Sequence, residues 1–413
     1  MTLSLQGRGT AAKQPGRGAE LVHTDPSPAR CARLPSPLQG EGEDALALYI
    51  HWPFCVSKCP YCDFNSHVRD RVDQEAWREA LLADLAHEAK LTPGRMLTSI
   101  FFGGGTPSLM PPATVAALIE AAGRHWRYAP DIEITLEANP SSVEAARFAD
   151  LARAGVNRVS LGLQALDDEA LAFLGRAHDV AEGLDALDTA QATFDRVSFD
   201  LIYARPGQSA DDWQAELERA LGFGTGHLSL YQLTIEPGTR FAALAIKGTL
   251  AEYDPDQAAD LFELTRAVTD ASGLPAYEVS NHARRGQESR HNLTYWRYGD
   301  YVGVGPGAHG RRNAIASIRR KKPENFLTAI ARNGHGIESE ERLSPEVRAQ
   351  EALLMGLRLD EGVDLERVQE AIDAPAAARL QALGFVLLDR QRLSVTPRGM
   401  LVLNQIIAEL ARY

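Results

Sequence analysis

Short apolar segments alternate with amphipathic helical segments over residues 45–271 of this chain. Six such alternations predict right-handed β–α–β crossovers and a parallel sheet. The periodicity does not distinguish an open sheet from a full or partial barrel, but in each of these folds ligands bind at the carboxyl ends of the strands. Strands are predicted over Leu46–His51, Thr98–Phe102, Ile132–Glu137, Arg158–Leu163, Arg196–Tyr203 and Leu228–Leu233. Helices are predicted over Gln74–Lys90, Ala113–Ala122, Ser142–Ala154, Ala210–Leu221 and Asp256–Ala271.

The remaining segments differ from this pattern. Residues 1–44 hold six glycines, five prolines and no aromatic residue. Such a segment cannot bury enough apolar surface to offset its ordering entropy, so it is expected to be a disordered N-terminal extension. Residues 45–280 are expected to form the α/β core, and residues 281–335 a connecting segment rich in glycine, aromatic and basic residues. Residues 336–413 have the pattern of helices around a short hairpin, which predicts a winged-helix-like C-terminal domain.

The composition excludes three classes of protein. The formal net charge of −12 argues against a general binder of nucleic acid, whose backbone attracts basic surfaces. No apolar run approaches the roughly 18 residues that a transmembrane helix needs. Four cysteines in 413 residues are too few for a disulfide scaffold.

Three of the four cysteines, Cys55, Cys59 and Cys62, fall within eight residues directly after the first predicted strand. Thiolates at this spacing in a loop can bind three irons of a [4Fe–4S] cluster and leave the fourth iron open to a ligand. Two other interpretations stay open on the cysteines alone: a zinc site completed by His51 or His67, and inert buried thiols. Cys31 lies in the N-terminal extension and is expected to play no part.

The residues around these cysteines strengthen the first interpretation. The spacing C-x3-C-x2-C, preceded by Tyr49-Ile-His-Trp-Pro-Phe and followed by Asp-Phe-Asn-Ser-His67, resembles the radical S-adenosylmethionine (SAM) family. It is similar to the branch that contains oxygen-independent coproporphyrinogen III oxidase and a related heme chaperone, and the similarity runs from about Tyr49 to the C-terminus. The resemblance implies a partial (β/α)6 TIM-like barrel. It also implies a cluster whose open iron chelates SAM, so that one electron can cleave the sulfonium to a 5′-deoxyadenosyl radical.

The resemblance also implies a set of SAM contacts near the carboxyl ends of the predicted strands. Tyr49, Gly104 and Glu137 match positions that hold the first SAM. Six further residues match positions that hold a second SAM in the oxidase: Tyr61, Gly105, Thr106, Gln164, Arg176 and Asp200. Glu137 read by itself is also compatible with a helix cap, and Arg176 with Asp200 is also compatible with a structural salt bridge.

A later segment offers groups that suit a porphyrin. His291, Tyr295 and Trp296 bring an imidazole and flat aromatic faces, although a histidine among aromatic residues is also common in packed cores. A basic run follows, and it either pairs with propionate carboxylates or forms a solvated loop. The run comprises Arg311, Arg312, Arg319, Arg320, Lys321 and Lys322.

One position separates the two branches of the family. The oxidase has a fourth cysteine two residues after the third, and this chain has Phe64 there. The sequence therefore favours a heme chaperone that holds a [4Fe–4S] cluster, SAM and heme, with porphyrinogen decarboxylation as the alternative and no catalytic residue assigned. Expected partners are heme or porphyrin, heme-acceptor proteins of respiration, an electron donor and, by analogy, a second copy of the chain. Because an exposed cluster is sensitive to oxygen, the expected location is the cytoplasm, including the inner membrane face.

Overall fold

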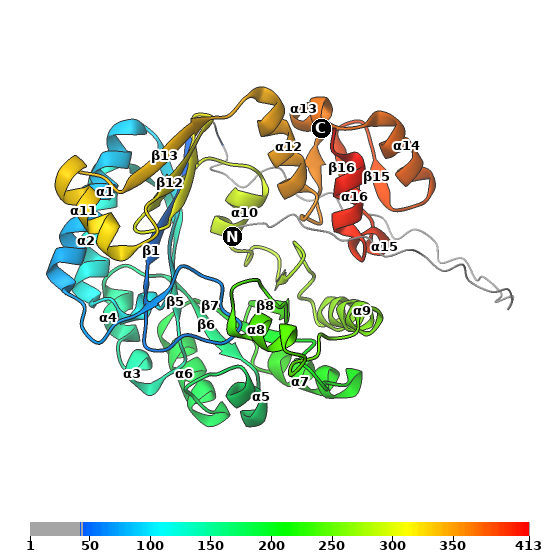
Figure 1. Ribbon diagram of the computed structural model, residues 1–413, viewed down its shortest axis with the longest axis horizontal. Coiled ribbons are helices and arrows are strands. Elements are labelled where there is room, and N and C mark those ends of the chain that lie inside the picture. Colours follow the sequence, from blue (N-terminus) through cyan, green and yellow to red (C-terminus); the bar gives the residue numbers. More distant parts are fainter. Residues whose placement is uncertain (1–41, 43, 413) are drawn as a thin grey trace, which may run out of the picture. The chain divides into compact units, whose positions relative to one another are not determined.

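The computed structural model describes residue 42 and residues 44–412, in which a curved eleven-stranded sheet forms the centre (Figure 1). The strand order is β13-β12-β11-β10-β1-β4-β5-β6-β7-β8-β9. The six strands β1, β4, β5, β6, β7 and β8 run parallel to one another, β10 pairs in parallel with β1, and β9 pairs antiparallel with β8. Within the described residues β13 and β9 remain at the two edges, so the barrel is partial, as predicted. The six parallel strands are β1 (Ala45–Trp52), β4 (Met96–Gly104), β5 (Arg127–Ala138), β6 (Arg158–Gln164), β7 (Arg196–Tyr203) and β8 (His227–Gln232).

Helices cover the outer side of this sheet, and apolar side chains fill the layer between them (Figure 1). Leu48, Ile100 and Leu136 belong to this layer, and each fully buried side chain of this size contributes about 1.5–3 kcal/mol. The predicted helix Ser142–Ala154 is interrupted and forms α3 and α4. No helix in the described part of the chain is long and apolar enough to cross a membrane. The helices are α1 (Gln74–Leu91), α2 (Pro112–His125), α3 (Ser142–Ala145), α4 (Phe148–Arg153), α5 (Asp168–Phe173), α6 (Val180–Thr193), α7 (Ala210–Gly222), α8 (Arg240–Ile246) and α9 (Pro255–Ala271).

The inner side of the sheet is polar. On β5, Ile134 and Leu136 belong to the apolar layer, while Glu133 and Thr135 point the other way and are also buried. A buried carboxylate needs ionic or hydrogen-bond partners. The interior of this partial barrel is therefore built to hold polar groups, unlike the Val-, Ile- and Leu-filled interior of a typical TIM barrel.

Residues 281–335, expected to be a connecting segment, instead extend the sheet together with residues 337–342, which were expected to belong to the C-terminal domain. β10 pairs in parallel with β1, and β11, β12 and β13 continue antiparallel beside it. The sequence pattern missed these strands because they are only four to six residues long, too short for a clear alternation. The added elements are β9 (Asn281–Ala283), α10 (Arg290–Trp296), β10 (Tyr301–Val304), β11 (His309–Arg312), β12 (Ile315–Arg319), α11 (Pro323–Asn333) and β13 (Ile337–Arg342).

A buried ionic network joins this extension to α1. Glu88 accepts from Arg312 Nε at 2.7 Å and from Arg319 Nη2 at 2.5 Å, and Asp84 accepts from Arg319 Nε at 3.1 Å. Asp84 also accepts from the backbone N–H groups of Gly305 and Gly336. Two arginines of the basic run are thus fully paired and buried, so this part of the run is neither a solvated loop nor available to propionates.

The C-terminal residues form a helical unit with its own core, which includes Leu353, Leu393 and Ile406. Its small sheet has the order β14-β16-β15 and contains the predicted hairpin. Arg297, which follows α10, pairs with Glu361 of this unit. The elements are α12 (Pro345–Gly356), β14 (Val363–Asp364), α13 (Leu365–Val368), α14 (Ala374–Ala382), β15 (Val386–Leu388), β16 (Arg392–Val395), α15 (Pro397–Met400) and α16 (Leu403–Leu410).

Candidate functional site

The cysteine loop leaves the carboxyl end of β1. Its two short strands β2 (Phe54–Cys55) and β3 (His67–Val68) pair in parallel, and between them the Cys62 N–H donates to the Cys59 carbonyl. All three thiols are half-buried, and burial raises the pKa of Cys55 and Cys62. A bound metal centre would offset that effect, because it stabilises the thiolate form.

The arrangement of donors tests the zinc alternative. Among the described residues, no three His, Cys, Asp or Glu side chains lie close enough together to hold one metal ion. His51 is also committed elsewhere: its Nε2 lies 2.9 Å from the Asn65 carbonyl and its Nδ1 lies 2.9 Å from the Tyr49 hydroxyl. A four-iron cluster does not need such convergence, because each thiolate binds a different iron. Three half-buried thiols in one loop therefore suit a cluster that takes one thiolate per iron.

The glycine loop after β4 packs directly against the start of the cysteine loop. The N–H groups of Gly105 and Thr106 donate to the carbonyls of Trp52 and Phe54. Gly104 has a φ of 114°, and a Cβ there would lie 2.6 Å from His51 and 2.8 Å from the Trp52 carbonyl. Only glycine fits this close approach. Its N–H donates to Glu137 Oε2 at 3.2 Å, so the predicted SAM residues Gly104 and Glu137 lie together.

Two carboxyl groups lie in the interior near this loop. Burial and, to a smaller extent, the nearby Asp200 raise the pKa of Glu137 to about 8. Burial likewise raises the pKa of Asp200, to about 6, against the opposing effect of hydrogen bonds from Ser229 and Ser160. A positively charged ligand bound beside these two carboxyl groups would lower their pKa values, because it stabilises the ionised form. Glu137 is not a helix cap, because the N-cap of the following helix α3 is Ser141.

Arg176 links the other predicted residues to the cysteines. Its Nη1 donates to Cys59 Sγ at 3.5 Å, and its Nη2 donates to the Gly162 carbonyl at 2.9 Å. Tyr61 lies beside Cys59 and Arg176, and burial raises the pKa of its phenol. Gln164 ends β6 with a φ of 71°, a left-handed backbone conformation that is uncommon outside glycine and frequent at functional sites. Arg176 donates to Cys59, Asn139 and Gly162, while Asp200 accepts from the Ser160 hydroxyl at 3.3 Å, so these two residues are not joined by the salt bridge that the sequence allowed.

The three candidate heme residues lie on α10, inside the barrel rather than at its carboxyl end. His291 is buried and its ring is 6.3 Å from that of Tyr49. Its Nδ1 is hydrogen-bonded to Ser99 Oγ at 2.9 Å, and its Nε2 to the Tyr295 hydroxyl at 2.8 Å. Neither ring nitrogen is free in this conformation, while Trp296 is partly exposed.

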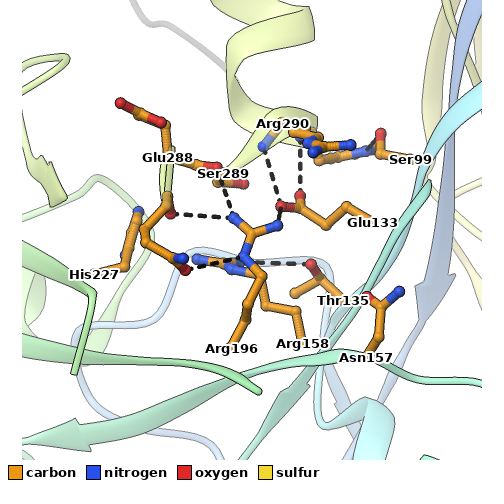
Figure 2. A network of polar contacts seen from close by, with 12 residues as sticks. Ser99, Glu133, Thr135, Asn157, Arg158, Arg196, His227, Glu288, Ser289 and Arg290 are labelled. Carbon is orange, nitrogen blue, oxygen red and sulfur yellow. Dashed lines mark hydrogen bonds and ion pairs between the residues drawn. The ribbon is translucent and has the colours of Figure 1, made fainter. Parts of the chain in front are cut away.

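A polar network holds the start of α10 in place (Figure 2). The buried Glu133 accepts from Arg196 Nη1 at 2.7 Å and from the backbone N–H groups of Arg290 and His291. Arg196 also donates to the carbonyl of Glu288 at 2.9 Å. The alternation of Ile132, Ile134 and Leu136 along the strand puts Glu133 on the opposite face, but only the fold shows that it anchors α10.

Asn65 and Asn139 were not singled out by the sequence, yet both connect parts of the site. Asn65 Nδ2 donates to the carbonyls of Pro306 and Lys321, which ties the cysteine loop to the added strands. Asn139 lies between Thr106 and Arg176. Its place two residues after Glu137, at the carboxyl end of a strand, was the only available signal.

Two family models match the chain, the radical SAM superfamily over residues 49–220 and the HemN C-terminal domain over residues 343–402. The chain is 40% identical over 388 residues to "Radical S-adenosyl methionine domain-containing protein 1, mitochondrial" of Bos taurus, covering 89% of this chain and 88% of that protein. It is 36% identical over 379 residues to the heme chaperone HemW of Escherichia coli (strain K12), covering 88% and 97%.

Among solved structures, coproporphyrinogen III oxidase (HemN) from Escherichia coli, a radical SAM enzyme, superposes with a TM-score of 0.75. The two chains are 23% identical, and the match covers 89% of this chain and 90% of that one. At this identity the likeness supports the fold, with its partial barrel and C-terminal unit, and not the oxidase activity.

Proposed function

This chain belongs to the heme chaperone HemW family within the radical SAM superfamily, and from that premise we propose that it binds heme and transfers it to acceptor proteins. The observation that carries the proposal is the similarity to a heme chaperone over 97% of that protein's length. Phe64, which occupies the position of the oxidase's fourth cysteine and is 56% exposed, favours the chaperone over the oxidase.

The radical SAM domain implies a [4Fe–4S] cluster and SAM, and the residues present fit both. Cys55, Cys59 and Cys62 would bind three irons. The SAM would lie near the carboxyl ends of the strands, among the residues that the family resemblance assigns to it: Tyr49, Tyr61, Gly104, Gly105, Thr106, Glu137, Gln164, Arg176 and Asp200. When bound, the cluster supplies a one-electron reductant and an open iron for the SAM. Tyr49 is held for this role by its hydrogen bond to His51, and the close packing of Gly104 keeps its loop against the cysteines.

The proposal extends to partners and place. Transfer requires an acceptor, for which respiratory heme proteins are proposed, and reduction of the cluster requires an external electron donor. We also propose that the chain forms a homodimer and that it acts in the cytoplasm or at the inner membrane face.

Heme binding by the reconstituted protein tests the function directly. Anaerobic titration with heme should give a saturable Soret band, and adding an apo-acceptor should move the heme to that protein. Release of 5′-deoxyadenosine together with decarboxylated coproporphyrinogen, and no stable heme complex, would instead establish the oxidase.

His291 is the proposed iron ligand, with Tyr295 and Trp296 against the porphyrin. Binding there requires His291 to give up its hydrogen bond to Ser99 or to Tyr295. His291→Ala should weaken heme binding by at least about tenfold and shift the Soret band, because an iron ligand is lost. His227→Ala is the matched control, since His227 is buried in the same interior and bonded to Ser198 and Tyr277. Equal losses in the two variants would contradict a ligand role.

SAM binding is expected to release a proton from Glu137. With its pKa near 8 this carboxyl is mostly protonated at pH 7, and the positive sulfonium favours the carboxylate. Affinity should therefore rise with pH up to about 8 and level off above that. Calorimetry in buffers of different ionisation enthalpy measures the protons released. Glu137→Gln should release fewer protons than the parent protein, and an unchanged number would contradict this role.

A further inference from the structure

We propose that Asn139 is a positioning residue that directs hydrogen bonds from two side chains to two of the cluster cysteines. The proposal rests on the cluster of the proposed function and assigns a role to a residue outside the cysteine and SAM sets. Thr106 Oγ1 donates to Cys55 Sγ at 3.5 Å, and Arg176 Nη1 donates to Cys59 Sγ at 3.5 Å. Asn139 lies between these two donors, 2.7 Å from Arg176 Nη2 and 3.1 Å from Thr106 Oγ1.

Chemistry fixes the orientation of the Asn139 amide. A guanidinium can only donate hydrogen bonds, so the atom of Asn139 that faces Arg176 must be the carbonyl oxygen Oδ1. The amide nitrogen Nδ2 then faces Thr106 and donates to its hydroxyl oxygen. A hydroxyl has one proton, and because Asn139 occupies a lone pair of that oxygen, the proton remains for Cys55. Arg176 therefore fixes the Asn139 amide, and the amide in turn directs the hydrogen bond of the Thr106 hydroxyl to Cys55.

The surroundings keep Asn139 in this position. Its backbone N–H donates to Glu144 Oε2 at 2.9 Å, and the Ser108 hydroxyl donates to the same carboxylate oxygen. Arg176 is fixed in turn by the Gly162 carbonyl, where a Cβ in place of the glycine hydrogen would lie 3.3 Å from Nη2. Thr106 is buried, so water does not compete strongly for its proton.

Hydrogen bonds to cysteine sulfurs stabilise the more negative, reduced form of an iron–sulfur cluster and so raise its reduction potential. Asn139 is therefore expected to set how readily the cluster accepts its electron, without touching the cluster or SAM itself. The third cysteine, Cys62, has its Sγ 3.9 Å from the Ser66 hydroxyl.

Asn139→Asp tests the proposal with the change of one group. The carboxylate still accepts from Arg176 but cannot donate to Thr106, whose proton then turns from Cys55 to the new acceptor. The added negative charge also lowers the potential, so the substitution is made both in the parent protein and in Thr106→Val. The midpoint potential is measured by an EPR-monitored redox titration of the anaerobically reconstituted protein.

The expected result is a coupling between positions 139 and 106. Asn139→Asp should move the reduction equilibrium towards the oxidised form by about tenfold more in the parent than in Thr106→Val, which is about 59 mV for a one-electron couple. Asn157→Asp is the matched control, because it adds the same charge at a residue that bonds only to the backbone of Ile132 and Ile134. It should leave the potential unchanged.

Equal shifts in the two backgrounds would overturn the proposal, since Asn139 would then act by charge alone. If Asn139→Asp fails to retain iron, Thr106→Val, which keeps the side-chain shape, must still lower the potential, and no shift there overturns it too. These outcomes leave heme binding untouched, whereas a parent protein that binds no iron would refute this proposal and the cluster of the proposed function together.

Discussion

Replacing Cys55, Cys59 or Cys62 with Ala is expected to abolish the visible iron–sulfur absorbance of the reconstituted protein. Each thiolate binds a different iron, and the fourth iron has no protein ligand, so two remaining thiolates cannot hold the cluster. Iron and sulfide analysis after anaerobic purification measures the loss, with about four irons per chain expected in the parent.

Cys31→Ala is the control for this experiment. Cys31 lies outside the described residues, and the sequence places it in the N-terminal extension, away from the three clustered cysteines. Its replacement should leave iron content and absorbance intact. Loss of the cluster in the Cys31 variant, or its retention in any of the three others, would refute the assignment of ligands.

Glu88→Ala is expected to lower the free energy of unfolding by about 3–5 kcal/mol, because it leaves two buried guanidinium groups without their shared carboxylate. The side chains of Glu88 and Arg319 are fully buried, and that of Arg312 is 4% exposed. Burial acts to raise the pKa of Glu88, but Arg319 and Arg312 outweigh it and hold that pKa below its usual range. The stabilisation that the ionised Glu88 gains from these two arginines is therefore present at neutral pH and is lost as the pH falls through the acid range.

Chemical denaturation at neutral pH measures the effect of Glu88→Ala. The matched control is Glu409→Ala, which breaks the pair with Arg379 on the surface, where the side chains are 41% and 59% exposed. Exposed pairs contribute at most about 1 kcal/mol, so this variant should unfold almost like the parent. Similar losses in the two variants would show that the buried network does not hold the added strands to α1.

The strand–helix alternation was sufficient to predict the parallel core, because each long strand is followed by a helix with one apolar face. The cysteine loop could also be predicted from the sequence, because its three thiols lie within eight residues and the pattern involves no distant residue. The strands from β10 to β13 escaped prediction because their pairing is decided by contacts with β1 and α1 rather than by local pattern.

By itself the sequence determined the order of the core elements, pointed to three clustered cysteines as cluster ligands and, through Phe64, favoured one of the two branches of the family. Only the tertiary structure decided that Arg312 lies against Glu88, 224 residues away, instead of in a solvated loop. It also decided that both nitrogens of His291 are occupied, and that Asn139 joins Thr106 to Arg176. The physical reason is the distance along the chain. Periodicity and spacing depend on residues that are close in sequence, whereas the partners of buried polar groups come from segments that are far apart in sequence and meet only in the fold.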